Sequence, residues 1–329
     1  MSKINIIKSN NSIQGAKCVG EYKFACGNSV PIYEVFTVHE LNQLVGYAKF
    51  LNREYGNVYY RGQCELYGTI SPSIYRQFKK AQKADTEVNL QIAKITKDKN
   101  ILRDLNISTD SETLIKAKIE GILQHYGAPT RFLDLVDNHW VSLWMGLFQY
   151  CTKKQVNTYS FYQKRQFDNV EKTSHLIEVA YENFKLKKEE RLKRENKDLE
   201  ERNKSLYQYL LLLAFPYGKV TDVGVEETDD FTIIDLRNAL PSIFLRPHAQ
   251  HALVIKKKGV KNDPLYYDVS GNVVGIVKIR IDRASEWLGN GTLMSVDNLF
   301  PSPLHDHGYD VLLSRDDLFE QRFKIVKYI

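Results

Sequence analysis

Gly127 and Pro129 place the strongest local constraint on the fold, because they interrupt a run of residues that otherwise has helical spacing. Apolar residues recur every three to four positions before them, at Ile115, Ile119 and Ile122. Pro129 has no amide hydrogen to donate, and its ring disfavours the helical conformation at the preceding residue. We therefore expect one helix to end at this point and a second, apolar helix to begin shortly after it.

The segment that joins the two expected helices is rich in polar side chains. They are Gln124, His125, Tyr126, Thr130, Arg131 and Asp134. Polar groups held between two buried elements can form a ligand site. Alternatively, they form a capping network in which Thr130 or Asp134 caps the second helix and Arg131 pairs with Asp134. The sequence alone leaves both interpretations open.

Strand and helix patterns both occur along the 329 residues, of which 43% are hydrophobic, enough for a sizeable core. Strands are expected at residues 57–62, 231–236, 252–255, 265–269 and 273–281, and helices at residues 37–51, 283–288 and 316–323. No linker rich in Pro, Gly or Ser divides the chain. We therefore expect a single α+β domain with a mixed or antiparallel sheet and helical insertions.

Two regions differ in pattern from this domain. Residues 1–34 alternate apolar and polar side chains and are expected to form a strand-rich N-terminal extension, which leaves residues 35–329 as the domain. Residues 185–204 contain several acid–base pairs four positions apart, as on the surface of a solvated helix. We therefore expect a charged helical insertion at about residues 160–215.

Composition and general motifs exclude several classes of protein. The net charge of +6 suits a nucleotide or nucleic-acid partner, but many other proteins have a similar charge. The four cysteines form no Cys-x-x-Cys pair, so we expect neither a metal nor a disulfide framework. No apolar run approaches the roughly 18 residues of a membrane helix, and the N-terminus lacks the apolar core of a signal peptide. We expect a cytoplasmic protein without a membrane partner. Dinucleotide-fingerprint, P-loop, hydrolase-elbow and zincin patterns are absent.

Two clusters contain residue types suited to anion binding. Arg61 follows an aromatic strand and precedes Gly62, so its planar guanidinium could reach a phosphate or carboxylate. An ordinary salt bridge is the alternative. Further on, Ser71 is expected to be the N-cap of a helix that begins at Pro72, with Arg76 nearby. Simple helix capping is the alternative there.

A third cluster, Arg246–Ala252, has one arginine, two histidines and a glutamine directly before an expected strand. His248 and His251 have a spacing that could mimic zinc ligands, but no carboxylate or cysteine nearby completes such a set. His305 and His307 lie in an expected surface turn, which favours a structural role.

Several of these motifs occur together in one known family. They are Tyr60-Arg61-Gly62-Gln63, Ser71-Pro-Ser-Ile-Tyr-Arg76, Leu123-Gln-His-Tyr-Gly-Ala-Pro-Thr-Arg-Phe-Leu-Asp134, Arg246-Pro-His-Ala-Gln250 and Leu299-Phe-Pro301. In this set the chain resembles the FRG domain family, over about residues 35–315. That resemblance indicates a site more securely than a reaction.

The aromatic-aromatic-Arg-Gly strand is also similar to the first motif of Arg-Ser-Glu-type ADP-ribosyltransferases, whose arginine holds the pyrophosphate of NAD. This resemblance implies a split sheet, with NAD as the substrate. The Ser-Thr-Ser strand and the catalytic glutamate of those enzymes are not evident here, so Gln250 or Asp134 would replace the glutamate. The implied catalytic residues are His125, Asp134 and Gln250. The implied NAD-binding residues are Arg61, Gly62, Gln63, Ser73, Arg76, Tyr126, Thr130, Arg131, Arg246 and His251.

Three functions are therefore considered. The first is an NAD-dependent ADP-ribosyltransferase of the bacterial toxin or phage-defence type, with a nucleic-acid or protein acceptor and a neutralising antitoxin as partner. The second is a metal-independent nuclease that uses His125, His251 and the arginines. The third is a non-catalytic module that senses a nucleotide or another anion.

Overall fold

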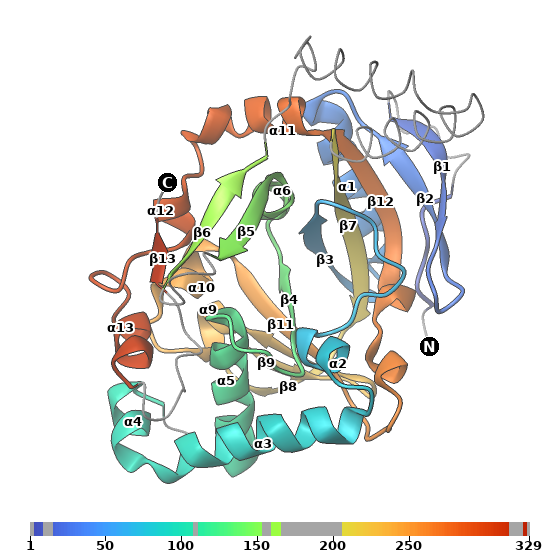
Figure 1. Ribbon diagram of the computed structural model, residues 1–329. Helices are drawn as coiled ribbons and strands as arrows, with labels where there is room; N and C mark the ends of the chain where they lie inside the picture. Colours follow the sequence, from blue (N-terminus) through green and yellow to red (C-terminus); the bar gives the residue numbers. More distant parts are fainter. Residues whose placement is uncertain are drawn as a thin grey trace, which may run out of the picture.

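A ten-stranded mixed sheet forms the centre of the molecule (Figure 1). The computed structural model describes residues 3–8, 16–107, 111–152, 159–165, 206–315 and 325–327. In spatial order the strands are β1 (Lys17–Lys23), β2 (Ser29–Glu34), β12 (Val273–Arg280), β7 (Tyr207–Pro216), β3 (Gly56–Gln63), β4 (Leu133–Val136), β11 (Ala252–Lys257), β10 (Phe231–Asp235), β9 (Val225–Glu227) and β8 (Lys219–Asp222). Only the β2–β12 pair is parallel among these neighbours. The α+β prediction is confirmed.

The sheet opens between β3 and β4. On one side β3 pairs with β7 along its whole length, from Gly56 to Gln63. On the other side it pairs with β4 only at Tyr60 and Val136. Beyond this pair, the backbones of β3 and β4 are not paired with each other. The structure thus has two half-sheets joined by one residue pair.

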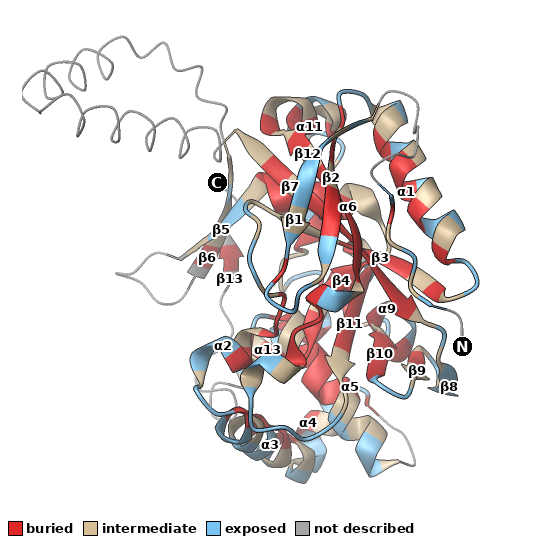
Figure 2. Ribbon diagram, turned by 90° about the vertical axis from the view of Figure 1, so that its right-hand side faces the viewer, coloured by how far each residue is buried: buried red, intermediate tan, exposed pale blue. Residues whose placement is uncertain are grey.

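Helices cover the two half-sheets separately (Figures 1 and 2). Helices α1 (Val38–Asn52), α6 (His139–Leu147) and α11 (Ile281–Trp287) contribute to one core with β3, β7 and β12. Helices α3 (Ala81–Lys97), α4 (Lys99–Asp104), α5 (Glu112–His125) and α9 (Leu236–Ala239) contribute to a second core with β10 and β11. Alternate residues of β7 are buried on opposite faces, Leu210 and Leu212 on one and Leu211 and Leu213 on the other.

A small second sheet lies beside the opening. Its strands are β5 (Phe148–Thr152), β6 (Tyr159–Lys164) and β13 (Ile325–Lys327). The remaining short helices are α2 (Ser73–Gln77), α10 (Leu245–Ala249), α12 (Val296–Leu299) and α13 (His307–Ser314), with 3₁₀ turns at Pro264–Tyr267, Ser270–Asn272 and Gly289–Gly291.

Local signals correctly predicted several of these elements. Thr37 caps α1, and its hydroxyl accepts a hydrogen bond from the Glu40 amide. Helix α5 ends at His125, where Gly127 adopts a left-handed φ of +103° that a glycine tolerates. The position of β3 was also predicted. These features depend on residues close in sequence.

Other predictions were wrong. The apolar run after Phe132 first forms the strand β4, and the second helix begins only at His139, capped by Asn138. The predicted capping by Thr130 or Asp134 therefore does not occur. Ser71 is not a helix cap, because Pro72 occupies that position before α2.

Three further regions differ from the prediction or fall outside the described residues. The predicted strand at 265–269 begins as a 3₁₀ turn. Both described ends of the predicted helical insertion at 160–215 are strands, β6 and β7. The charged segment 185–204 and the predicted helix at 316–323 lie outside the described residues. The boundary at residues 34 and 35 stays a prediction, with β2 of the extension paired to β12.

Candidate functional site

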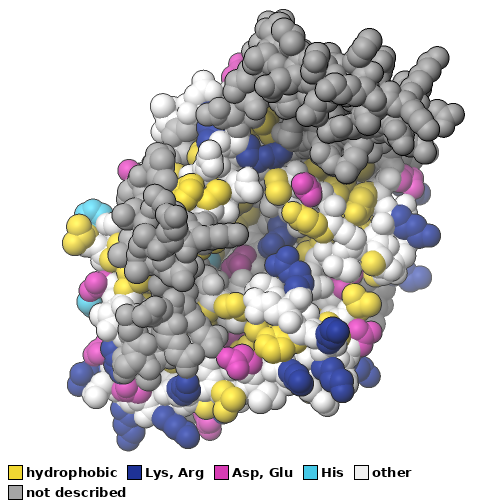
Figure 3. Space-filling model, in the orientation of Figure 1, with side chains coloured by type: hydrophobic (Ala, Val, Ile, Leu, Met, Phe, Trp, Pro, Cys, Tyr) yellow, Lys and Arg dark blue, Asp and Glu magenta, His cyan; other side chains and the backbone are white. Residues whose placement is uncertain are grey.

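A cavity of about 580 Å³ lies at the opening between β3 and β4. Its walls come from both half-sheets, from the end of α5, from α10 and the residue after it, and from the small sheet. The polar and aromatic lining residues are Tyr60, Arg61, Ser73, Gln124, His125, Tyr126, Asp134, Ser142, Tyr150, Ser160, Tyr162, Arg246, Gln250 and Phe300. In the space-filling view, Lys and Arg side chains lie beside a hollow near the centre (Figure 3). Motifs far apart in sequence thus meet in one cavity.

Arg61 spans the opening from the β3 side. Its Nη1 donates a hydrogen bond of 2.6 Å to the backbone oxygen of Asp134 on β4, so the side chain replaces a missing strand-to-strand bond. Its Nε has no partner among the described residues. Burial lowers the pKa of Arg61, and Arg76 lowers it further, while Asp134 opposes both. An arginine remains charged despite such a shift, so Arg61 presents a cation to the cavity.

Asp134 faces the cavity from β4 with a side chain that is 43% exposed. Its Oδ2 accepts a hydrogen bond from Gln124 Nε2, and its Oδ1 lies 3.7 Å from His125 Nδ1. The hydroxyl of buried Thr130 donates in turn to Gln124 Oε1 over 2.7 Å. Thr130 therefore does not line the cavity but fixes the amide that orients Asp134.

Arg246 forms a second cationic group in the cavity. It is 4% exposed, and its guanidinium lies 4.5 Å from the ring centre of Tyr126 and 4.3 Å from that of Tyr309. Asp306 Oδ2 accepts hydrogen bonds from the Tyr126 hydroxyl, at 2.6 Å, and from the Arg246 amide, at 3.0 Å. Burial raises the pKa of Tyr126 despite the opposing effect of Arg246, so the phenol stays a proton donor.

A second cavity, of about 620 Å³, lies elsewhere along β3 but has a different character. Its arginine Arg237 is already paired with two of its acids, since Nη2 lies 2.7 Å from Asp137 and 2.8 Å from Asp235. Among the described residues, seven buried side-chain atoms without hydrogen-bond partners belong to residues that line the first cavity and none to residues that line the second. They are Tyr60 Oη, Arg61 Nε, His125 Nε2, Asp134 Oδ1, Ser142 Oγ, Arg246 Nε and Arg246 Nη2. Unpaired buried groups each cost about 1–3 kcal/mol, which favours the first cavity as the ligand site.

Comparison with known families supports the same region. Residues 56–158 match the family model of the FRG domain. Residues 56–158 are an FRG domain, and the cavity at the opening between β3 and β4 is called the FRG cavity below. No curated protein and no solved structure matches the chain. The FRG match runs from the start of β3 through β4, so it contains both Arg61 and Asp134. No matching protein supports the resemblance to ADP-ribosyltransferases, which stays a prediction.

Gln250 and His251, both predicted site residues of the third cluster, lie on different sides of the FRG cavity wall. Gln250 lines it, although its Nε2 is engaged by the backbone oxygen of Leu299 at 2.7 Å. His251 does not line it. With a φ of +50°, His251 is directed to the other side, where its Nδ1 lies 3.2 Å from both Asp137 and Arg237. Its predicted role in ligand binding is therefore corrected.

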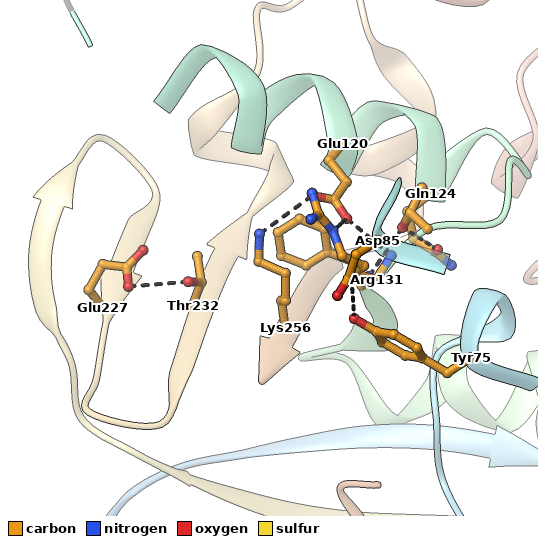
Figure 4. Close-up of polar contacts among 10 residues, drawn as sticks. Tyr75, Asp85, Glu120, Gln124, Arg131, Glu227, Thr232 and Lys256 are labelled. Carbon is orange, nitrogen blue, oxygen red and sulfur yellow. Dashed lines mark hydrogen bonds and ion pairs between the residues drawn. The ribbon is translucent and has the colours of Figure 1, made fainter. Parts of the chain in front are cut away.

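Arg131 is also outside the FRG cavity (Figure 4). It binds Glu120 rather than the predicted Asp134, with Nε 2.8 Å from one carboxylate oxygen and Nη2 2.7 Å from the other. Glu120 is 1% exposed, and Lys256 lies 3.4 Å from it. Burial alone would raise the pKa of Glu120, but Lys256 and Arg131 hold it below its usual value. Arg131 therefore neutralises a buried acid and is not available to a ligand.

Of the other predicted site residues, some line the FRG cavity and some do not. Gly62, Ser73, His125 and Tyr126 line the cavity, whereas Gln63 and Arg76 do not. Arg76 is exposed and acts at a distance, through its effect on the pKa of Arg61.

Several lining residues were missed by sequence reasoning as site residues. They are Tyr60, Gln124, Ser142, Tyr150, Ser160, Tyr162 and Phe300. Tyr60, Gln124 and Phe300 lie within the motifs quoted above, which was the signal for them. Tyr150 and Tyr162 are on β5 and β6, and only their aromatic character marked them. Ser142 had no signal, because it is a small residue within an apolar helix.

Within the described part of the chain, no helix has the length and apolar character needed to cross a membrane. No group of three or more His, Cys, Asp or Glu side chains there could hold a metal ion.

Proposed function

We propose that the FRG cavity binds NAD and that the chain transfers ADP-ribose to an acceptor. The observation that supports this most is the meeting of Arg61 and Asp134 where β3 and β4 diverge. Among the described residues, neither Arg61 Nε nor Asp134 Oδ1 has a hydrogen-bond partner. A cation suits the pyrophosphate of NAD, and a carboxylate suits the positive charge that develops on the ribose during glycosidic cleavage.

In the proposed reaction the bond between ribose C1′ and the nicotinamide nitrogen breaks, and its electron pair leaves with nicotinamide. The ribose acquires oxocarbenium-like charge, which the carboxylate of Asp134 stabilises. An oxygen or nitrogen atom of the acceptor then bonds to C1′ and loses its proton to His125 or Asp134. The products are nicotinamide, the ADP-ribosylated acceptor and one proton.

The remaining polar groups have supporting roles in this proposal. Gln124 holds the carboxylate of Asp134 in place, and Thr130 holds Gln124. The amide oxygen of Gln250 accepts a hydrogen bond from a ribose hydroxyl, while its nitrogen stays bonded to Leu299.

The acceptor, the partner and the compartment also belong to the proposal. The acceptor is a nucleic acid or a protein. An enzyme that consumes NAD in its own cell would require a neutralising partner, as in toxin–antitoxin pairs or phage defence. The four cysteines are free, which suits the reducing cytoplasm.

Release of nicotinamide from NAD tests the proposed function, with RNA, DNA or cell lysate supplied as the acceptor. Asp134→Asn keeps the size of the side chain and its hydrogen bond from Gln124 but removes the charge. We expect it to lower the rate by about 100-fold or more. Arg61→Ala should weaken NAD binding by roughly 10- to 100-fold through loss of a charge-assisted contact. Arg283→Lys, outside the cavity, is the control. Unchanged NAD affinity in Arg61→Ala would refute the assignment.

A non-catalytic nucleotide sensor is the second candidate. Hydrogen bonds to Gln124 and Leu299 already hold Asp134 and Gln250 in the protein, as expected for groups that shape a binding pocket. Saturable NAD binding that depends on Arg61, without nicotinamide release under any condition, would favour this function. Degradation of RNA or DNA in the absence of NAD would instead identify the nuclease.

A further inference from the structure

One edge of the buried Arg246 guanidinium makes no hydrogen bond to the described residues. Its Nε and Nη2 atoms form the side of the guanidinium that can donate two parallel hydrogen bonds to one anionic group. Neither atom has a hydrogen-bond partner among the described residues, although Arg246 is 4% exposed and lines the cavity. Two unsatisfied donors on one edge of a buried cation favour a role in binding an anion over a structural pair.

The surroundings of Arg246 hold the guanidinium in place without neutralising it. Tyr126 and Tyr309 lie within 4.5 Å of it, and Phe300 lies 5.3 Å away. The nearby carboxylate of Asp306 is occupied by other donors, the hydroxyl of Tyr126 and the backbone amides of Arg246 and Tyr309. The aromatic rings offset part of the cost of burying the charge. An anion at the free edge would offset the rest.

Aromatic side chains beside Arg246 indicate what else the anion carries. Phe300 stacks on Tyr162 with ring centres 4.3 Å apart, and Tyr162 contacts Tyr150 at 5.4 Å. All three rings line the cavity, and Tyr150 is 52% exposed. Stacking on such side chains stabilises a nucleobase of any sequence by about 1–3 kcal/mol.

We propose that Arg246 binds the phosphate of a second nucleotide, the acceptor, whose base packs on Tyr150 and Tyr162. That this nucleotide is the acceptor rests on the proposed function, whereas the phosphate site itself does not. Arg61, on the opposite half-sheet, is then left for the pyrophosphate of NAD. The acceptor is a nucleoside phosphate, which is either a free mononucleotide or the phosphorylated end of a nucleic acid.

Calorimetric binding of AMP and adenosine tests the phosphate site directly. Arg246→Lys keeps the charge but loses the two-donor edge, so it should weaken AMP binding roughly tenfold or more and leave adenosine binding unchanged. Arg283→Lys is the matched control, since Arg283 also lies over an aromatic ring, that of Phe36, but does not line the cavity. Equal AMP affinity in the two variants would overturn the proposal. Loss of affinity in Arg61→Lys equal to that in Arg246→Lys would mean that a single phosphate is shared, and would overturn the second site.

An NMR measurement on the wild-type chain tests the same site without requiring that a variant folds. In the wild-type chain, the Nε–H resonance of Arg246 should shift on addition of AMP and not on addition of adenosine. Short oligonucleotides with and without a 5′-phosphate then distinguish the two sources of the phosphate. Nicotinamide release is measured separately. If AMP binds through Arg246 but no nicotinamide is released, the proposed transferase fails while the phosphate site stands.

Discussion

Three arginines of this chain have different capacities to bind a ligand, and their partners explain the difference. Arg131 donates to both oxygens of Glu120 and has its charge neutralised. Among the described residues, Arg61 donates to a backbone oxygen alone, and Arg246 lies among aromatic rings with no acid bonded to its guanidinium. The sequence motifs predicted a ligand-binding role for all three arginines, because a local motif does not show that Glu120, on a neighbouring helix, pairs with Arg131.

The Arg131–Glu120 pair provides a test at the residue scale. Arg131→Met would leave the buried carboxylate with Lys256 alone, and should destabilise the fold by about 3–5 kcal/mol in urea unfolding. Glu120→Gln combined with Arg131→Met should recover part of this loss, because no unpaired charge remains. Arg103→Met is the control, since Arg103 is 76% exposed beside Asp104, and should change stability by less than about 1 kcal/mol. A similar loss in Arg103→Met and Arg131→Met would contradict this account.

At the scale of elements, the glycine of the aromatic-Arg-Gly motif sets the distance between β3 and α6. A Cβ atom on Gly62 would overlap with the carbonyl oxygen of Ser142 and come within 2.7 Å of the Gly146 amide nitrogen. The motif glycine thus lines the cavity and also lets α6 lie close behind the strand that carries Arg61. Its predicted role in NAD binding stays a prediction.

Gly62→Ala should therefore destabilise the protein by about 1–3 kcal/mol, because the backbone of α6 must move. Gly46 supplies a matched control on α1, where an added Cβ meets no atom within 4 Å. Gly46→Ala should stabilise the protein by up to about 1 kcal/mol, through the helix propensity of alanine. Thermal or urea unfolding measures both. If Gly62→Ala proves neutral, the close packing of α6 is not what requires glycine.

The elements that sequence reasoning predicted are those whose signals are local. Thr37 and Gly127 mark helix ends, and alternation marks β3. The four-residue strand β4 could not be recognised, because its apolar residues fit a helix equally well and its partners in β3 and β11 are far away in sequence. The aromatic wall from β5 and β6 escaped prediction for the same reason.

For the whole molecule, His139 should make stability depend on pH. Burial lowers the pKa of His139 from 6.5 to about 4, and Lys49 adds to this effect. The unfolded chain then takes up a proton near pH 6.5 that the folded chain resists until about pH 4. The corresponding stability is fully present above pH 6.5 and is lost as the pH falls toward 4.

Unfolding free energies measured between pH 7 and pH 4 should therefore fall more steeply for the wild type than for His139→Gln. The amide of glutamine can still bond to Asn42, the partner that joins α6 to α1 in the native chain. Lys49→Met should also reduce the slope, since it removes the positive charge beside the imidazole. Equal slopes in the wild type and His139→Gln would exclude this histidine as the cause.

The opening between β3 and β4 also bears on aggregation. A strand with an unpaired backbone edge is normally a hazard, because another chain can add to it. Strand β4 has such an edge in the interior of its sheet, since it pairs with β11 at four positions and with β3 at one. Here that edge lies at the cavity that Arg61, Tyr60 and Ser142 line. Side chains of the neighbouring half-sheet thus cover this edge of β4, and Arg61 occupies the Asp134 carbonyl, so another polypeptide cannot add to the strand there.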